Sequence, residues 1–179
     1  MHYLEILQFW FEEIESKFWF KKDTSFDQLI TERFLDVYKS AAAGECYSWR
    51  ESSKGRLAEI IVLDQFPRNI FRDKPESFAT DNQALVLAQE AVAGDHLANL
   101  AGKEQAFLLM PYMHSESSLI HEKALVLFDK PGLESNLEFE QKHKAIIDRF
   151  GRYPHRNKIL GRVSTAQELE FLKQPGSSF

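Results

Sequence analysis

A run of basic residues near the C-terminus is the strongest chemical signal in this sequence. Between Arg149 and Gln167 the chain carries five Lys or Arg residues and neither Asp nor Glu. The whole protein has formal net charge −5, so the residues outside this run must sum to −10. The local charge governs binding, because physiological salt screens charges that lie more than about 8 Å apart. The run therefore predicts an anion-binding site on an acidic protein.

The backbone of this run is expected to be irregular, because it contains Gly151 and Pro154. Irregular segments can turn both side chains and backbone amides toward a ligand. Arginines would bind the anion and a histidine could exchange a proton with it. The alternative is a solvated basic loop in which Asp148 pairs with Arg152. The candidate ligand-binding residues here are Arg152, His155, Arg156 and Asn157.

A second polar segment, from Leu63 to Arg72, sets charged and amide side chains among large apolar ones. A helical turn that starts at Pro67 would place Arg68 and Arg72 on one face, where both could grip one carboxylate or phosphate. Asn69 lies between them. The alternative is structural: Asp64 pairs with Arg68 and ties one helix to the next.

The segment Pro111–Glu116 adds a histidine and a carboxylate that could exchange protons with a bound molecule. The candidate acid–base residues are therefore His114 and Glu116, together with Asp64 and His155. Alternatively, Glu116 could have a helix-capping role near the positive N-terminus of a helix. Their spacing differs from His-Glu-x-x-His, so no metal site is predicted.

The elements that must position these residues are helical. Apolar residues recur three and four apart, and no run of alternating, β-branched residues indicates a strand. We predict an all-α fold of seven to nine helices with short connections, which indicates an antiparallel helical array. Capping boxes are predicted at Ser25, Ser135 and Thr165, and a helix break at Phe66, since a residue before proline avoids helical dihedrals.

Length and composition predict one domain over residues 1–173, followed by a flexible tail over 174–179. The sequence is 44% hydrophobic and contains 15 Phe, enough for a packed core. Its single cysteine, Cys46, excludes an intrachain disulfide and favours a cytoplasmic location. No stretch reads as a membrane span. Basic residues concentrated at one place argue against general nucleic-acid binding.

Four motifs in order, Leu63–Arg72, Phe78–Asp81, Pro111–Glu116 and Arg149–Asn157, resemble the bacterial domain-of-unknown-function family 924. The similarity spans nearly the whole chain, and Glu12 departs from it where the family pattern has glycine. The resemblance implies an all-α fold similar to tetratricopeptide-like helical arrays, but it implies no activity. The matching polar residues are Asp64, Gln65, Arg68, Asn69, Arg72, His114, Glu116, Arg152, His155, Arg156 and Asn157.

The leading functional hypothesis is a pocket for a small anionic ligand, phosphorylated or carboxylated, on which Arg68, Arg72, Arg152 and Arg156 converge. Catalysis is its stronger form, although no reaction or cofactor can be read from these residues. The alternative is a non-catalytic tetratricopeptide-like adaptor whose arginines capture an acidic peptide or a terminal carboxylate of a protein partner. A third possibility is that the arginines are purely structural, each forming an ion pair with an acidic residue of another helix. The sequence leaves the oligomeric state open.

Overall fold

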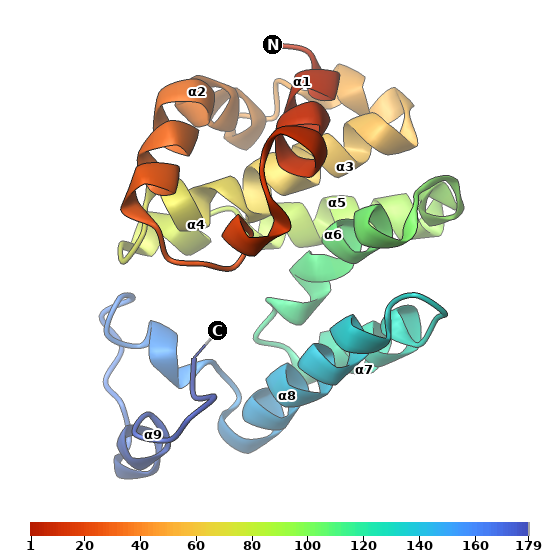
Figure 1. Cartoon of the computed structure of the whole chain (residues 1–179). Coiled ribbons are helices and arrows are strands. Elements are labelled where there is room, and N and C mark those ends of the chain that lie inside the picture. Colours follow the sequence, from red (N-terminus) through yellow and green to blue (C-terminus); the bar gives the residue numbers. More distant parts are fainter. Residues whose placement is uncertain (179) are drawn as a thin grey trace.

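The computed structural model of this chain describes residues 1–178, and within that range it contains nine α-helices and no strand. This confirms the predicted all-α helical array. Figure 1 shows α1–α6 gathered in one part of the molecule and the α7–α8 pair with α9 in another. The helices are α1 (Tyr3–Gln8), α2 (Thr24–Ala42), α3 (Ser53–Asp64), α4 (Phe66–Ile70), α5 (Asp81–Ala93), α6 (Gly102–Met113), α7 (Ser118–Phe128), α8 (Glu134–Phe150) and α9 (Ala166–Phe171).

Helix α3 forms the centre of the N-terminal part. Its sequence is apolar around nearly the whole helix from Leu57 to Leu63, which is the pattern of a helix buried on all sides. Every residue from Leu57 to Asp64 is fully buried. Helices α1, α2, α5 and α6 pack around it (Figure 1). A polar residue at the end of α3 is therefore carried into the interior.

The predicted break before Pro67 is confirmed. Helix α3 ends at Asp64, and α4 begins at Phe66 with Pro67 in its first turn. Proline lacks an N–H group, and the first turn of a helix is where that loss costs least. The break turns the chain just after Asp64, so that Arg68 lies one turn away from it.

The C-terminal part is built on the α7–α8 pair. Helix α8 ends at Phe150, and the following Gly151 adopts a left-handed conformation with φ 68°, which is typical of a glycine that ends a helix. The chain then forms a short 3₁₀ turn, η6 (Pro154–Arg156). Behind it Ile146, Ile147 and Tyr153 form a second small hydrophobic cluster. This cluster anchors the basic run against α8.

Two predicted helix caps are wrong. Asp23, not Ser25, caps α2, because the Asp23 side chain accepts a hydrogen bond from the Phe26 N–H group. Helix α8 begins at Glu134 after Leu133, and Ser135 does not cap it. Thr165 does cap α9 in the predicted capping box with Glu168. Asp and Ser are similarly good N-caps, so the sequence alone does not distinguish Asp23 from Ser25.

The segment that follows α9 contacts its C-terminal end. Ser177 is buried, and its hydroxyl donates to the Leu172 carbonyl over 3.2 Å, although the composition of 174–179 predicts a tail without fixed structure. Phe179, the last residue of that predicted tail, falls outside the described residues. None of the helices in residues 1–178 is long and apolar enough to cross a membrane.

Candidate functional site

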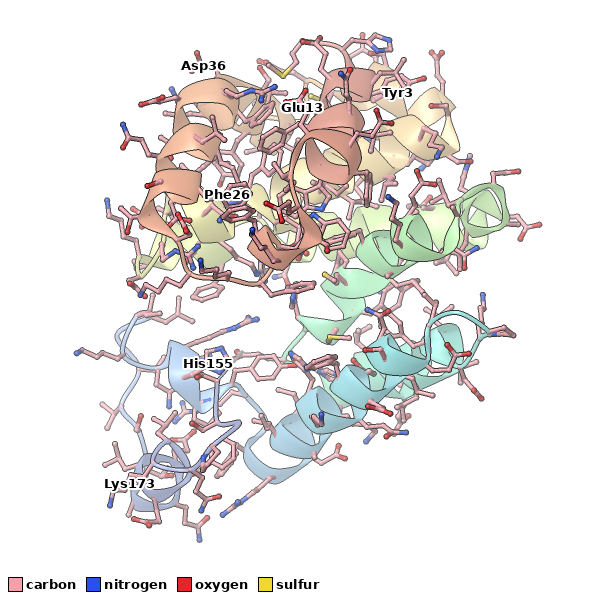
Figure 2. All side chains as sticks on the ribbon, in the orientation of Figure 1. Tyr3, Glu13, Phe26, Asp36, His155 and Lys173 are labelled. Carbon is pink, nitrogen blue, oxygen red and sulfur yellow. The ribbon has the colours of Figure 1, made fainter. Side chains whose placement is uncertain are left out.

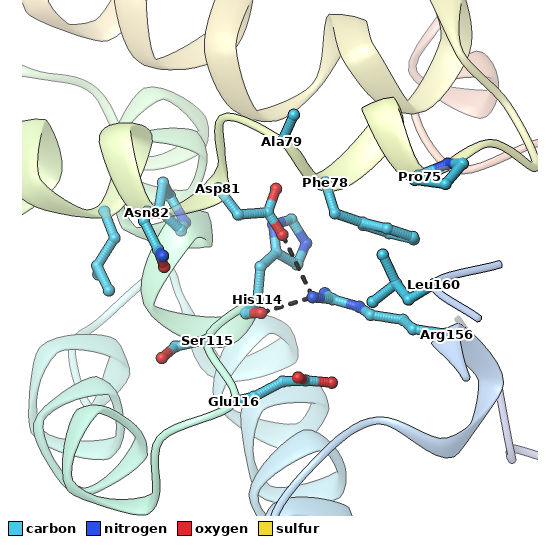
Figure 3. Close-up of a pocket in the computed structure, with 12 residues that line it drawn as sticks. Pro75, Phe78, Ala79, Asp81, Asn82, His114, Ser115, Glu116, Arg156 and Leu160 are labelled. Atoms are coloured by element: carbon cyan, nitrogen blue, oxygen red, sulfur yellow. Dashed lines mark hydrogen bonds and ion pairs between the residues drawn. The ribbon is translucent and has the colours of Figure 1, made fainter. Parts of the chain in front are cut away.

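A cavity of about 260 Å³ lies where the start of α5, the end of α6 and the η6 turn meet (Figure 3). These three regions come from distant parts of the sequence and carry three of the four motifs described above. Polar and apolar side chains share the wall. The lining residues are Pro75, Phe78, Ala79, Asp81, Asn82, Leu85, Pro111, His114, Ser115, Glu116, Arg156 and Leu160.

The imidazole of His114 is held by the buried carboxylate of Asp64, with 2.7 Å between Nδ1 and Oδ1. Burial alone would raise the pKa of Asp64, but the neighbouring His114 and Arg68 outweigh it and lower this pKa to about 2. An ionised carboxylate can only accept hydrogen bonds, so His114 must donate through Nδ1–H. Burial also lowers the pKa of His114, and the charge of Arg68 lowers it further. His114 is therefore uncharged near neutral pH, with its lone pair on Nε2.

Two arginines and one carboxylate surround this pair. Arg68 donates to both oxygens of Asp81, over 2.9 and 3.1 Å, and also to the backbone carbonyl of Asp64. Arg156 donates to Asp81 Oδ2 over a longer 3.3 Å (Figure 3). Its guanidinium carbon lies 4.6 Å from the centre of the Phe78 ring, a stacking geometry that suits arginine. Asp81 thus joins the two guanidinium groups into one buried network.

The backbone that follows α6 is fixed by side chains from the C-terminal part. Three successive carbonyl groups, those of Met113, His114 and Ser115, accept from the Tyr153 hydroxyl (2.6 Å), Arg156 Nη2 (3.1 Å) and His121 Nε2 (2.8 Å). The carbonyls at a helix C-terminus have no partner within the helix and need such donors. These contacts lock the position from which the His114 side chain reaches Asp64.

Glu116 reaches the cavity wall, but both of its oxygens are engaged. They accept two hydrogen bonds from Arg162, over 2.6 and 2.9 Å, and one from the Tyr153 N–H group over 2.7 Å. Burial would raise the pKa of Glu116, but these bonds lower it. Glu116 is therefore an ionised anchor for the basic run, and its geometry suits that structural role better than proton exchange.

The predicted residues Asn69 and Arg72 lie away from the cavity. Arg72 forms two hydrogen bonds with Asp27 of α2, over 2.5 and 2.6 Å, and Asn69 donates to the same carboxylate over 2.9 Å. The Leu63–Arg72 motif therefore serves two places. Asp64 and Arg68 belong to the network at the cavity, while Asn69 and Arg72 tie α4 and the turn after it to α2.

Three residues of the basic run are likewise absent from the cavity wall. Arg152 forms two hydrogen bonds with Glu168 of α9, over 2.7 and 2.8 Å, and Asn157 donates to Ser164 Oγ over 3.0 Å. His155 lies in the C-terminal part (Figure 2), where burial lowers its pKa to about 4. The structure thus brings Arg68 and Arg156 to one carboxylate and directs Arg72 and Arg152 to two others.

Asp81 is the central residue that sequence reasoning missed. Asp81 is the first residue of α5, a position where an acidic residue is common for reasons of helix stability alone. The only sequence signal was its presence in the Phe78–Asp81 motif. Its two arginine partners lie 13 and 75 residues away along the chain, so no local pattern could pair them.

Together the fold and the site define an all-α helical array in which a small cavity is lined by an oriented histidine, an arginine and a carboxylate. The chain belongs to the family described as "Bacterial protein of unknown function (DUF924)", which matches residues 6–176. A solved structure, a protein of unknown function, ATU0120, from Agrobacterium tumefaciens, is 35% identical with a TM-score of 0.90, and the match covers 96% of each chain. No curated protein matches the sequence.

Proposed function

We propose that the cavity binds a small molecule bearing a carboxylate or phosphate group, with Arg156 as the anion ligand and His114 as a neighbouring proton acceptor. The observation that carries this proposal is the imidazole of His114, held by buried Asp64, on the same cavity wall as Arg156. Carboxylate-held imidazoles with a free Nε2 are the usual form of a histidine general base.

Arg156 is the arginine best suited to receive a ligand. Its contact with Asp81, at 3.3 Å, is longer than either Arg68 contact, and within residues 1–178 its buried Nε–H group has no hydrogen-bond partner. Arginine binds carboxylates and phosphates through paired N–H donors. A ligand anion could therefore take Arg156 while Asp81 keeps Arg68.

The size of the cavity favours a small metabolite. Its volume of about 260 Å³ falls just below the roughly 300 Å³ at which sites for drug-sized ligands begin. This favours a small ligand over the extended peptide of the adaptor alternative.

We also propose a cytoplasmic location, on the ground that the single cysteine, Cys46, is free and buried.

A thermal-shift screen tests the proposal. Small carboxylates, amino acids included, and phosphates are added to the wild type, to Arg156→Gln and to the matched control Arg152→Gln, which loses an arginine paired outside the cavity. A ligand at 100 times its Kd adds about 2.7 kcal/mol, so Tm should rise by about 5 °C or more in the wild type and in Arg152→Gln. Arg156→Gln should not respond. If no compound raises the Tm of the wild type, or if the Tm of Arg156→Gln rises equally, the proposal is contradicted.

The role of His114 is tested on the ligand that this screen identifies. His114→Gln keeps a polar side chain of similar length but cannot accept a proton near neutral pH. Binding should fall by less than tenfold, whereas any turnover of the ligand should fall by about 100-fold or more, the usual contribution of a general base.

A further inference from the structure

The charges around the cavity balance. Asp64 and Asp81 carry two negative charges, Arg68 and Arg156 carry two positive ones, and His114 is neutral. Glu116 and Arg162 cancel each other at the edge of the cavity. The side chains of Asp64, Arg156, Asp81 and Arg68 are 0%, 8%, 15% and 21% exposed, so these four charges have limited contact with water.

A simple anion would disturb this balance. It would bring one uncompensated negative charge into a buried network, and burying an unpaired charge is costly. If the anion displaced Asp81 from Arg156, two negative groups would also face each other across a few ångströms. A ligand with one negative and one positive group adds no net charge and avoids both costs.

The Arg156–Asp81 contact is the place where such a ligand fits. It is a single N–H···O contact of 3.3 Å, whereas Arg68 holds Asp81 through two. A carboxylate inserted there would accept from Arg156. An ammonium group on the adjacent carbon would then donate to Asp81 Oδ2 and replace the hydrogen bond that Arg156 gave up. Each half of the opened ion pair would regain a partner.

Apolar side chains form a large part of the remaining cavity wall, beside the polar residues Asn82, Ser115 and Glu116. Phe78, Leu85 and Leu160 line it together with prolines 75 and 111. Figure 3 shows Phe78 and Leu160 beside the Arg156 side chain. This wall can receive a hydrocarbon group attached close to the charged end of the ligand.

We propose that the ligand is an α-amino acid with an apolar side chain, its carboxylate bound by Arg156 and its ammonium group by Asp81. This inference rests on the proposed function and narrows it, because it requires a positive group beside the anion. It makes Asp81 the residue that selects zwitterions over plain acids.

Calorimetric titration of the wild-type protein tests the inference. The probes are valine, leucine, methionine and phenylalanine, each compared with the acid that lacks its amino group and the amine that lacks its carboxylate. Inorganic phosphate is included as a plain anion. At least one amino acid should bind, and its matched acid and matched amine should each bind at least tenfold more weakly.

A variant pair assigns the selectivity to Asp81. In Asp81→Asn the amino acid should lose at least tenfold in affinity, so that its advantage over the matched acid disappears. Asp148→Asn is the control, because Asp148 pairs with Lys144 on the outside of α8 and should leave all affinities unchanged. Should Asp81→Asn fail to fold, the wild-type comparison of each amino acid with its two halves still decides the question.

The outcomes separate this inference from the proposed function. If a plain acid or phosphate binds the wild type as tightly as any amino acid, or if only these anions bind, the proposal of a zwitterionic ligand is wrong. The proposed anion site then remains supported. Should the amines bind as tightly as the amino acids, or should nothing bind at all, both proposals fail.

Discussion

At the scale of single residues, the central feature is a histidine whose protonation is set by its surroundings. Asp64 fixes the proton of His114 on Nδ1, while burial and Arg68 keep the ring uncharged. The same carboxylate accepts a hydrogen bond from Gln65 Nε2 over 2.5 Å, which leaves Asp64 little freedom to move. An oriented neutral imidazole on a cavity wall is the arrangement that proton transfer requires.

Asp64→Asn should change the titration of His114. The negative charge of Asp64 raises the pKa of His114, so its removal should lower this pKa below the wild-type value. Because Arg68 keeps Asp81 as a partner while the buried hydrogen bonds of Asp64 are disturbed, the free energy of unfolding should fall by about 1–3 kcal/mol. Imidazole ¹⁵N NMR and urea unfolding measure the two effects.

Asp73→Asn is the control, since Asp73 pairs with Lys22 at the surface. An unchanged His114 titration in Asp64→Asn would contradict the assigned role of this carboxylate. Wild-type spectra give an independent check, because they should show the Nδ1–H tautomer at pH 7.

The kinds of residue at the site could be predicted from the sequence, but their partners could not. The acid-free basic run and the polar residues of two other motifs indicated chemistry, and Asp64, Arg68, His114 and Arg156 do meet in one network. Arg72, however, pairs with Asp27, which lies 45 residues away in the sequence, and Arg156 pairs with Asp81, which lies 75 residues away. Such pairs depend on helix packing, which charge patterns along the chain do not contain.

At the scale of elements, the site depends on one helix end held by two other segments. The carbonyl groups after α6 are capped by Tyr153, Arg156 and His121 instead of by a local motif. Helix boundaries set by proline and glycine, at Pro67 and Gly151, follow from local sterics and were predictable. Side-chain caps from distant segments, like these three, follow from the fold.

Tyr153→Phe should loosen this helix end. The substitution removes the hydroxyl that donates to the Met113 carbonyl and leaves a buried acceptor unsatisfied, which costs about 1–3 kcal/mol. Chemical denaturation should show this loss, and amide hydrogen exchange should accelerate in residues 110–117. Tyr47→Phe, at a largely exposed tyrosine, should change stability by less than about 0.5 kcal/mol. Equal stability of Tyr153→Phe and the wild type would contradict the capping role.

At the scale of the whole molecule, many charged and titratable groups are buried and paired. Burial lowers the pKa of His143 to about 3 and that of His155 to about 4. The bond from Arg152 lowers the pKa of Glu168 to about 2, against an ordinary value of 4.5. In each case the folded protein binds protons less readily than the unfolded chain does.

Stability should therefore fall in acid over two overlapping ranges. The histidines stabilise the fold fully above their unfolded pKa of about 6.5, and their contribution is lost as the pH falls toward 4 and then 3. The ionised carboxylates of Glu168 and Asp64 stabilise the fold fully above about pH 4.5, and this stabilisation is lost as the pH falls toward 2. Urea unfolding between pH 7 and pH 3 should show a continuous decline in the free energy of unfolding.

Glu168→Gln separates the two ranges. Its deficit relative to the wild type should be largest above pH 4.5 and should shrink as the pH falls, because the wild type then loses the same contribution. A free energy of unfolding that stays constant between pH 6.5 and pH 4 would contradict the depressed pKa values of the histidines.

The most direct test of the central claim follows the His114 ring nitrogens by ¹⁵N NMR while leucine, 4-methylpentanoate and inorganic phosphate are added in turn. With at least one of these probes the His114 Nε2 signal should move saturably, the His143 signals should stay in place, and the shift should vanish in Arg156→Gln. If the His114 signals do not move with any of the three probes, or if they move equally in Arg156→Gln, this cavity is not the binding site.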